Sequence, residues 1–368
     1  MRKLKYLYLR FERMKFRAKC FLVGSKRRIV RSIFGDMTII SVKNNFDSSN
    51  PRVAILGLFP ASNEIYLYSL QNLLVGLKVN KTQIIAVSNK QLEKEMINLL
   101  EKYNATVIVR KNQGRDFGAY QCGLLWLKKE RLLGNVKRLF FINDTLIWLN
   151  SSRDVLEGTS KYDWQSIYLN LERNVHAHSF YLSFSEKVIQ SEGFLKFWEA
   201  YSPQDSRNHA IHKGENELSN ILLISGFTCK PLVTPEFLQS TYKKIKKSPS
   251  LIRRVKNTPI GDLYPGIPPH SGKVGKTFLD YKNNDLVINE LATFVYSDAP
   301  HRLGLVLHLL SEIPLKVDLF KYYSVSEIAS TVKQARNVQL VADFYALKAQ
   351  QFQKSDSLTI KLRRLGEI

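Results

Sequence analysis

The chain has 368 residues, and 44% of them are hydrophobic, so it can form one large folded domain with appendages or two domains. Its formal net charge of +23 favours anionic partners: nucleic acid, an acidic membrane surface or phosphorylated substrates. Three widely spaced cysteines form no metal or disulfide framework, and no apolar run approaches the ~20 residues that span a bilayer. We therefore expect a cytoplasmic protein, or one held peripherally on the inner face of the cytoplasmic membrane.

Residues 1–34 are densely basic, and their apolar residues recur at spacings of three and four, which predicts an amphipathic helix. Such a helix can lie on an anionic membrane surface with its lysines and arginines at the head groups. It can equally pack on its own domain and expose a solvated basic face. A polar linker is predicted to follow at residues 41–51.

From residue 52, apolar strand patterns alternate with helical patterns. This alternation predicts an α/β fold of the Rossmann type, with a mostly parallel sheet flanked by helices and with ligands at the carboxyl ends of the strands. The predicted strands are 52–59, 82–88, 105–110 and 138–144, and the predicted helices are 64–78, 90–102 and 119–133.

After residue 150 the pattern weakens. We expect strands at 166–171 and 178–185, helices at 187–201 and 215–227, an irregular stretch at 245–290 and helix again over 300–354. This divides the chain into a basic segment with its linker (1–50), an α/β domain (51–240) and a C-terminal region packed on that domain (241–368).

The segment KNQGRDFGAYQCGL (111–124) is the first candidate site, because it lies between a predicted strand and a predicted helix. Arg115 could grip a phosphate, Asp116 and Asn112 could bind a ribose or base, and Gly114 and Gly118 would let the backbone approach a ligand. The alternative is a simple helix start with a capping residue. The segment is neither a dinucleotide-binding GxGxxG nor a phosphate-binding P-loop.

The strand FFINDTL (140–146) is the second candidate, since it ends in Asn143 and Asp144. A carboxylate at the exposed end of a strand is a typical ligand for a divalent ion that also binds substrate phosphates. The alternative is a turn formed by the Asn-Asp pair.

Two later pairs of titratable residues complete the candidates. Glu215 and Glu217 are predicted at a helix N-terminus, where one of them could act as a general base or both could be ordinary first-turn acids. His176 and His178 alternate along a predicted strand, so they could face one phosphate or sugar, or form a surface pair.

The order of NQGRDFGAYQCGL, FFINDT and GENELSNILLISGF resembles the nucleotide-sugar glycosyltransferases of GT-A fold. More closely, the chain resembles the rhamnan-synthesis F family of bacterial polysaccharide assembly. That resemblance includes HAHSFYLSFSEKVI and FLKFWEAY and, more loosely, IPLKVDLFKYYSVSEI, and it spans residues 52 to 328.

The resemblance implies transfer of a sugar, such as rhamnose or another deoxyhexose, from a nucleotide-sugar donor to a glycan or lipid-linked acceptor by an inverting displacement. It implies that Asn112, Arg115 and Asp116 meet the donor, that Asp144 stands at the metal-binding D-x-D position with Mg²⁺ or Mn²⁺, and that Glu215 stands near the catalytic base. The chain departs from the pattern by keeping one carboxylate in FFINDT and by having Glu215-Asn216 in place of Glu-Asp. Metal dependence therefore stays open, and Glu215 or Glu217 has to serve as the base, with Glu215 ranked first.

Two other functions are compatible with parts of this pattern. The positive charge fits a nucleic-acid-binding protein, but no RNP motif, zinc-finger spacing or helix-turn-helix signature accompanies it, so we expect no specific nucleic acid partner. The reduced carboxylate motifs fit a non-catalytic partner subunit with a glycosyltransferase fold.

Overall fold

The computed structural model describes seven stretches of the chain and a few isolated positions. The described stretches are 39–60, 63–150, 153–157, 161–171, 174–247, 313–319 and 338–354, and the isolated positions are 14, 18, 22, 295, 300, 304, 307, 308, 328, 329 and 332. Apart from positions 14, 18 and 22, the predicted basic helix at 1–34 lies outside the described residues, as does most of the predicted irregular stretch at 245–290.

An eight-stranded sheet forms the centre of the molecule, in the order β1-β4-β3-β2-β5-β10-β7-β11. The inner strands β4, β3, β2 and β5 are parallel to one another, β11 is parallel to β7, and β1 and β10 run antiparallel to their neighbours. The predicted α/β fold with a mostly parallel sheet is thus confirmed. In sheet order the strands are β1 (Ile39–Lys43), β4 (Thr106–Arg110), β3 (Gln83–Ser88), β2 (Arg52–Leu58), β5 (Arg138–Asn143), β10 (Tyr181–Ser185), β7 (Trp164–Ser166) and β11 (Cys229–Pro231).

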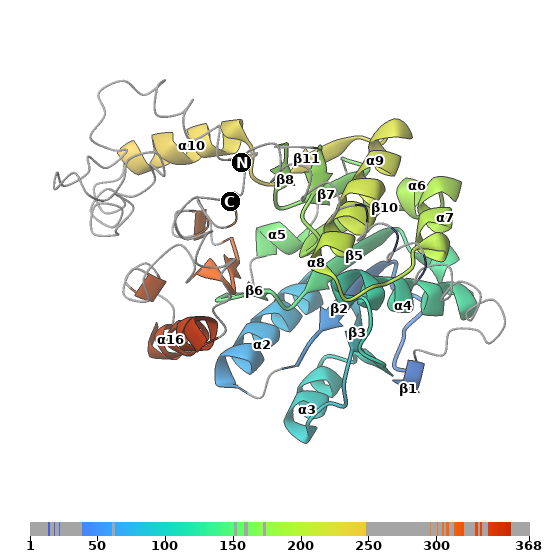
Figure 1. Cartoon of the computed structure of the whole chain (residues 1–368), viewed down its shortest axis with the longest axis horizontal. Coiled ribbons are helices and arrows are strands. Elements are labelled where there is room, and N and C mark those ends of the chain that lie inside the picture. Colours follow the sequence, from blue (N-terminus) through green and yellow to red (C-terminus); the bar gives the residue numbers. More distant parts are fainter. Residues whose placement is uncertain are drawn as a thin grey trace.

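Helices cover both faces of this sheet (Figure 1). On β2, Ala54 and Leu56 pack toward one set of helices, and Val53 and Ile55 pack toward the other. Because successive side chains of a strand point to opposite faces, a strand covered on both sides is apolar throughout. The first face carries α2 (Glu64–Val79), α3 (Lys94–Lys102) and α5 (Arg153–Glu157), and the second carries α4 (Arg115–Lys129), α7 (Glu192–Ala200) and α9 (Asn216–Ile224).

The first half of the chain follows the predicted elements closely, with three corrections. Residues 41–43 belong to the edge strand β1 and not to a linker, because they pair with β4. Helix α3 begins at Lys94 and not at residue 90. Helix α4 begins at Arg115 and not at residue 119, so the Arg-Asp pair of the candidate site lies in the first helical turn.

In the second half, the strands and helices are shorter and more numerous than the sequence pattern predicts. The strand expected at 166–171 is divided between β7 and β8 (Leu169–Asn170). The one expected at 178–185 begins three residues later, as β10, and a separate short strand, β9 (His176–Ala177), precedes it. The helix expected at 187–201 is α6 (Glu186–Ile189) followed by α7, because Ser191 caps α7 by accepting from the backbone N–H of Phe194.

Residues 207–224 form one helical run. It consists of α8 (Arg207–His209), the π-helical stretch η2 (Ala210–Glu215) and α9. Glu215 is therefore inside this run, and the prediction that it lies at a helix N-terminus is wrong. The run ends near Gly226, whose left-handed φ of 72° fits the predicted C-terminal cap.

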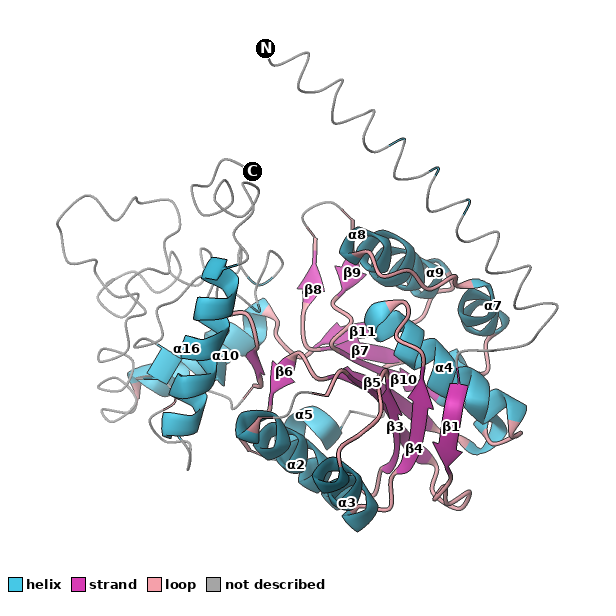
Figure 2. Cartoon of the chain, turned by 60° about the horizontal axis from the view of Figure 1, so that its bottom comes forward, coloured by secondary structure: helices cyan, strands magenta, loops and turns pink. Residues whose placement is uncertain are grey.

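Short elements join the C-terminal region to the sheet edge. The strand β12 (Leu315–Lys316) pairs with β6 (Leu146–Ile147), which follows β5 directly, and α16 (Val338–Lys354) packs against α2 (Figure 2). The remaining described elements are the 3₁₀ turn η1 (Leu133–Asn135) and α10 (Pro235–Lys246).

Candidate active site

A cleft of about 530 Å³ lies at the carboxyl ends of β2, β4 and β5. Four of the predicted site residues line it: Asn112, Arg115, Asp116 and Asp144. Its other walls include the loop after β2 and the helix α16. Parallel strands end at this edge, so the polar residues that follow three different strands meet here.

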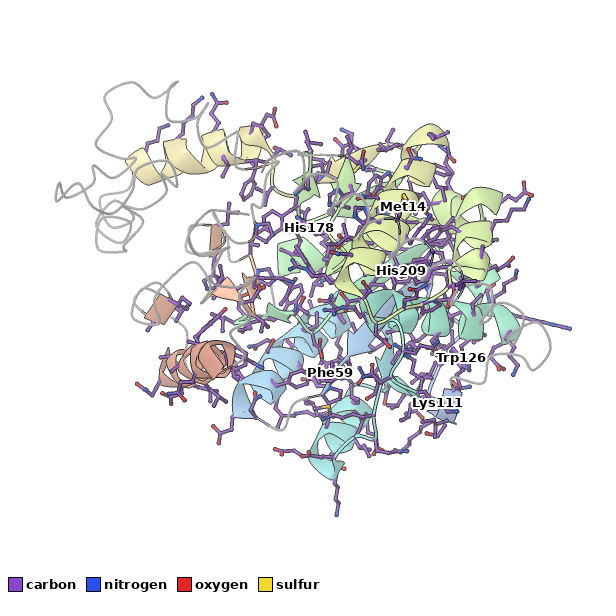
Figure 3. The ribbon with its side chains drawn as sticks, viewed as in Figure 1. Met14, Phe59, Lys111, Trp126, His178 and His209 are labelled. Carbon is purple, nitrogen blue, oxygen red and sulfur yellow. The ribbon has the colours of Figure 1, made fainter. Side chains whose placement is uncertain are left out.

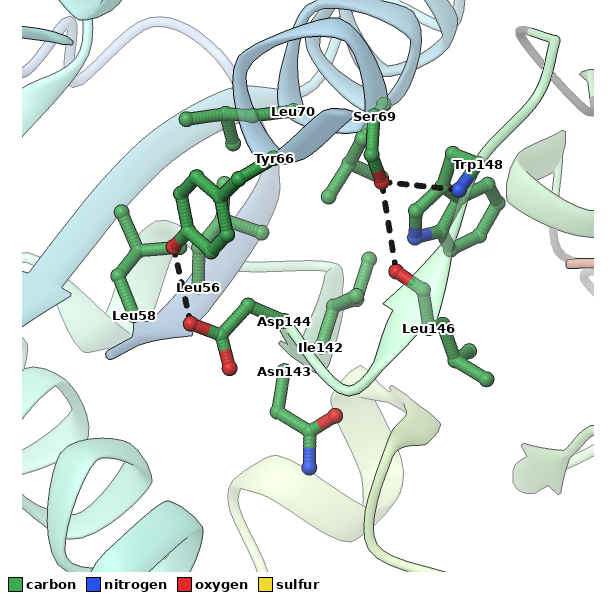
Figure 4. A pocket seen from close by; sticks show the side chains of 11 residues that line it. Leu56, Leu58, Tyr66, Ser69, Leu70, Ile142, Asn143, Asp144, Leu146 and Trp148 are labelled. Atoms are coloured by element: carbon green, nitrogen blue, oxygen red, sulfur yellow. Dashed lines mark hydrogen bonds between the residues drawn. The ribbon is translucent and has the colours of Figure 1, made fainter. Parts of the chain in front are cut away.

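Asp144 is held in a fixed orientation at the end of β5. Its Oδ2 atom accepts from the hydroxyl of Tyr66 at 2.9 Å (Figure 4). The same oxygen accepts from the backbone N–H of Phe59. A small cavity of about 20 Å³ lies behind it, lined largely by leucines. Burial raises the pKa of Asp144 to about 6; the two hydrogen bonds oppose this rise, and the charge of Asp116 adds to it.

Asp116 lies in the first turn of α4, where the helix dipole stabilises a carboxylate. Its Oδ2 atom accepts from the side-chain amide of Asn143 at 2.5 Å. The other end of that amide, Oδ1, accepts from the backbone N–H and the hydroxyl of Thr145 at 3.1 and 2.6 Å. Asn143 thus supports Asp116 from behind and is not itself part of the cleft wall.

The two glycines of the first motif contact the protein itself. A Cβ atom at Gly114 would lie 2.0 Å from the Cβ of Pro203, and the Gly114 N–H donates to Asp205 at 2.6 Å. A Cβ atom at Gly118 would lie 2.2 Å from the carbonyl oxygen of Gln113. The expectation that these glycines leave space for a ligand is therefore wrong, because the chain's own atoms occupy that space.

Arg115 and Asn112 are both exposed in the cleft wall. Arg115 has a left-handed φ of 51°, which is rare for a residue with a side chain and is often found at functional sites. Asn112 accepts from the side-chain amide of Asn89, 3.2 Å away, which also lines the cleft. The buried guanidinium of Arg110 fixes this loop by donating to the carbonyl of Gln113 at 2.6 Å.

Glu215 is buried beside this cluster, with 9% of its surface exposed. Its Oε1 atom accepts from the backbone N–H of Ser179 at 2.7 Å, and the hydroxyl of Ser179 lies 3.4 Å from Oδ2 of Asp116. Burial raises the pKa of Glu215; hydrogen bonds from Ser179 and the nearby His176 oppose this, whereas Asp116 adds to it. A carboxylate with a raised pKa is suited to accepting a proton.

The structure separates Glu217 from this cluster. Its side chain is about half exposed and pairs with Lys213 one helical turn earlier. Surface pairs of this kind contribute little to stability, and nothing in this geometry gives Glu217 access to the cleft.

The two histidines lie together on the Glu215 side, with ring centroids 5.9 Å apart. His176 donates from Nδ1 to the carbonyl of Asn174 at 2.8 Å, since a carbonyl can only accept. His178 stacks on Phe180, with ring centroids 5.3 Å apart. Figure 3 shows His178 well apart from Phe59, which lines the cleft; neither histidine belongs to the cleft wall.

Three carboxylates in the described part of the chain line the cleft: Asp116, Asp144 and Asp205. Asp205 accepts from the Gly114 N–H, so Asp116 and Asp144 are the pair that a divalent ion would meet. The charge of Asp116 disfavours the ionised form of Asp144, and a cation would offset that repulsion. Among the described residues no group of three His, Cys, Asp or Glu side chains is arranged to hold a metal. The donor set therefore fits an ion that takes the rest of its ligands from substrate phosphates and water.

The sequence patterns missed three residues of the cluster. Ser179 joins Glu215 to Asp116, Tyr66 positions Asp144, and Lys316 donates to Thr145 at 2.6 Å. Ser179 and Lys316 both lie in segments quoted for the family resemblance, HAHSFYL and IPLKVDLF. No spacing rule points to any of the three, because their partners are distant in sequence.

Residues 84–262 match the family model described as rhamnan synthesis protein F. The resemblance to this family is confirmed for that region. The match includes the first motif, the Asn143-Asp144 turn, Ser179 and Glu215.

A curated relative from Sinorhizobium fredii, the uncharacterized protein y4gN, is 28% identical over 189 residues. The alignment covers 49% of this chain and 47% of the relative, so the chain spans about half the length of the protein it matches.

Two solved glycosyltransferase structures have a partly similar shape. The glycosyltransferase GlyE of Streptococcus pneumoniae is 11% identical, with 67% of this chain and 64% of GlyE covered and a TM-score of 0.33. The mannosyltransferase PcManGT of Pyrobaculum calidifontis, solved with GDP-Man and Mn²⁺, is also 11% identical, with 93% and 98% covered and a TM-score of 0.33. Because both scores are low, a function for this chain has to come from its own site.

Proposed function

We propose that this protein is a glycosyltransferase that moves a sugar from a nucleotide-sugar donor to a polysaccharide or lipid-linked glycan. The single observation that carries this proposal is the arrangement of Asp116, Asp144 and Arg115 around one cleft, with the buried Glu215 linked to it through Ser179. The family match over residues 84–262 supports the same function. A deoxyhexose such as rhamnose is the sugar that the family description favours.

In this proposal the cleft binds the donor. Arg115 binds the diphosphate, because a guanidinium forms paired hydrogen bonds with phosphate oxygens. Asn112 and Asn89 contact the nucleoside at the exposed end of the cleft. Asp116 and Asp144 would hold Mg²⁺ or Mn²⁺, which when bound would supply positive charge to the diphosphate.

Glu215 acts as the general base. The acceptor hydroxyl oxygen forms a bond to the anomeric carbon, the bond from that carbon to the diphosphate oxygen breaks, and its electron pair leaves with the nucleoside diphosphate. The hydroxyl proton passes to the Glu215 carboxylate. The Ser179 N–H holds that carboxylate at 2.7 Å, and a single displacement of this kind inverts the anomeric carbon.

A membrane surface is the proposed location of the reaction. No helix in the described part of the chain has the length and apolar character to cross a membrane. Residues 1–34 are strongly basic, which supports peripheral binding to anionic lipid on the cytoplasmic side, where a lipid-linked acceptor would be reached. Pelleting with anionic vesicles tests this: removal of residues 1–34 should reduce binding while donor affinity is retained.

A panel of nucleotide sugars tests the function. A true donor should raise the melting temperature by mass action, and it should release its nucleoside diphosphate when an acceptor glycan is present. Asp144→Asn should abolish this turnover without unfolding the protein. If no nucleotide sugar stabilises the wild-type chain, or if Asp144→Asn turns over normally, the proposed function is wrong.

A further inference from the structure

Lys316 is far from the other site residues in sequence, yet backbone hydrogen bonds hold it beside them. Its strand β12 pairs with β6, the strand that begins directly after Thr145. The residue after Lys316, Val317, donates its N–H to the Thr145 carbonyl at 2.9 Å. The hydroxyl of Tyr345 on α16 donates to the Lys316 carbonyl at 2.6 Å. The backbone of Lys316 is thus fixed from two sides.

The ammonium of Lys316 lies against Thr145, a residue of the cleft wall. Its Nζ atom donates to the Thr145 hydroxyl at 2.6 Å, and Thr145 lines the cleft. The same ammonium lies 4.5 Å from the ring centroid of Phe180, a favourable cation–π distance. The aromatic face and the hydroxyl hold the charge in place.

Negative groups surround this charge. Burial lowers the pKa of Lys316, while the carboxylates of Asp318, Asp116 and Glu215 oppose that effect, and Arg207 adds to it. The ammonium therefore interacts electrostatically both with the Asp116 carboxylate in the cleft wall and with Glu215, the proposed base.

An ammonium has three N–H donors in a flexible arrangement, and Thr145 takes one of them. A phosphate oxygen placed in the cleft beside Thr145 would be within reach of another. A positive charge already in position costs no reorganisation when negative charge develops on the leaving group.

We propose that Lys316 is a further donor-binding residue of the proposed transferase, which contacts the diphosphate beside Thr145 and stabilises it as the leaving group. This inference rests on the proposed function. It also gives the segment at 313–319 a role in the reaction, beyond packing on the sheet edge.

Calorimetric titration with nucleoside diphosphates tests the inference. Wild-type protein is titrated with UDP, GDP and dTDP and with the matching nucleosides. Lys316→Met should weaken binding of the preferred diphosphate roughly 10- to 100-fold, the usual worth of a charge-assisted hydrogen bond, and should leave nucleoside binding unchanged. Lys316→Arg, which keeps the charge, should recover most of the lost affinity.

Two further variants separate charge from structure. Lys316→Gln keeps a donor for Thr145 but not the charge, so it should resemble Lys316→Met, and it replaces that variant if Lys316→Met fails to fold. Lys230→Met is the matched control, because Lys230 also lies over an aromatic ring, Tyr162 at 5.2 Å, but is exposed on β11 away from the cleft.

The outcomes distinguish the two proposals. If wild-type protein binds none of the three diphosphates, the proposed function fails and the role of Lys316 fails with it. If wild-type protein binds one of them and folded Lys316→Gln or Lys316→Met binds it equally well, only the role of Lys316 is overturned. An equal loss for nucleoside and diphosphate would show a merely structural role and would also overturn it.

Discussion

The two halves of the sheet contribute to the site in different ways. The half formed by β4, β3, β2 and β5 has parallel strands of five to seven residues, and Asp116 and Asp144 follow two of them at the cleft. The half formed by β10, β7 and β11 has strands of three to five residues, and it brings Ser179 and Glu215 behind the cleft.

This difference indicates that the two halves contribute to different steps, donor binding and the chemical step. Groups in the first half line the cleft and can reach a donor directly, whereas Glu215 is nearly enclosed and is positioned by one backbone N–H. We therefore expect changes in the first half to act on donor binding, and changes at Glu215 to act on the chemical step. The predictions for Glu215 and Glu217 test that division, and those for Gly114 and Asp144 test how each region contributes to stability.

The largest effect is expected for Glu215→Gln. Loss of the general base should lower kcat by about 10²- to 10⁴-fold, with donor affinity unchanged within a factor of about two. Steady-state kinetics and titration with the nucleoside diphosphate measure the two quantities. A donor affinity that falls in parallel with kcat would contradict the division between the halves.

Gly114→Ala should break the contact between the halves. The added methyl group would collide with Pro203, and alanine is strained at a φ of 79°, so the free energy of unfolding should fall by about 3 kcal/mol. Urea denaturation measures this loss. Gly134→Ala is the control, because its Cβ atom would have no heavy atom within 4 Å, and its effect should be below about 1 kcal/mol.

Asp144 should make stability depend on pH. Its pKa is about 6 in the folded chain against an ordinary value of 3.8, so the folded state binds the extra proton between these values. As pH rises through this window, the wild-type protein should lose up to about 3 kcal/mol relative to Asp144→Asn, which has no carboxyl to ionise. Urea denaturation at several pH values measures the difference, and parallel curves for the two proteins would contradict it.

The smallest effect is expected for Glu217→Gln. Its exposed pair with Lys213 should contribute less than about 1 kcal/mol to stability, and kcat should stay near the wild-type value. This variant lies two residues from Glu215 on the same helical run, so it sharpens the first prediction. A loss of kcat as large as that of Glu215→Gln would move the base to Glu217.

Much of the first half could be predicted, because local chemistry determines it. Strands buried on both faces are apolar throughout, as in β2 and β5, and polar residues directly after them must lie at the carboxyl edge. That reasoning placed Asn112, Arg115, Asp116 and Asp144 near one another, and all four line the cleft. The start of α4 was placed four residues late, because Arg115 adopts a left-handed backbone that no propensity favours.

The second half and the supporting contacts depended on the tertiary structure. The sequence pattern predicts that a helix begins at Glu215. In the structure the π-helical stretch η2 ends at Glu215 and continues directly into α9, so Glu215 lies inside a longer helical run. The roles of Gly114 and Gly118 were set by Pro203 and by the chain's own carbonyl groups, which only folding brings near.

The sequence by itself determined the α/β class, the carboxyl edge as the place of the site and the family resemblance, since these depend on periodicity and on short motifs. Only the tertiary structure decided that Ser179 holds Glu215, that Tyr66 holds Asp144 and that Lys316 reaches Thr145 across 171 positions of sequence. Hydrogen bonds between residues distant in sequence produce no periodic pattern in that sequence. Each of them depends on the register of the strands and the position of the helices, and the packing of the whole sheet determines both.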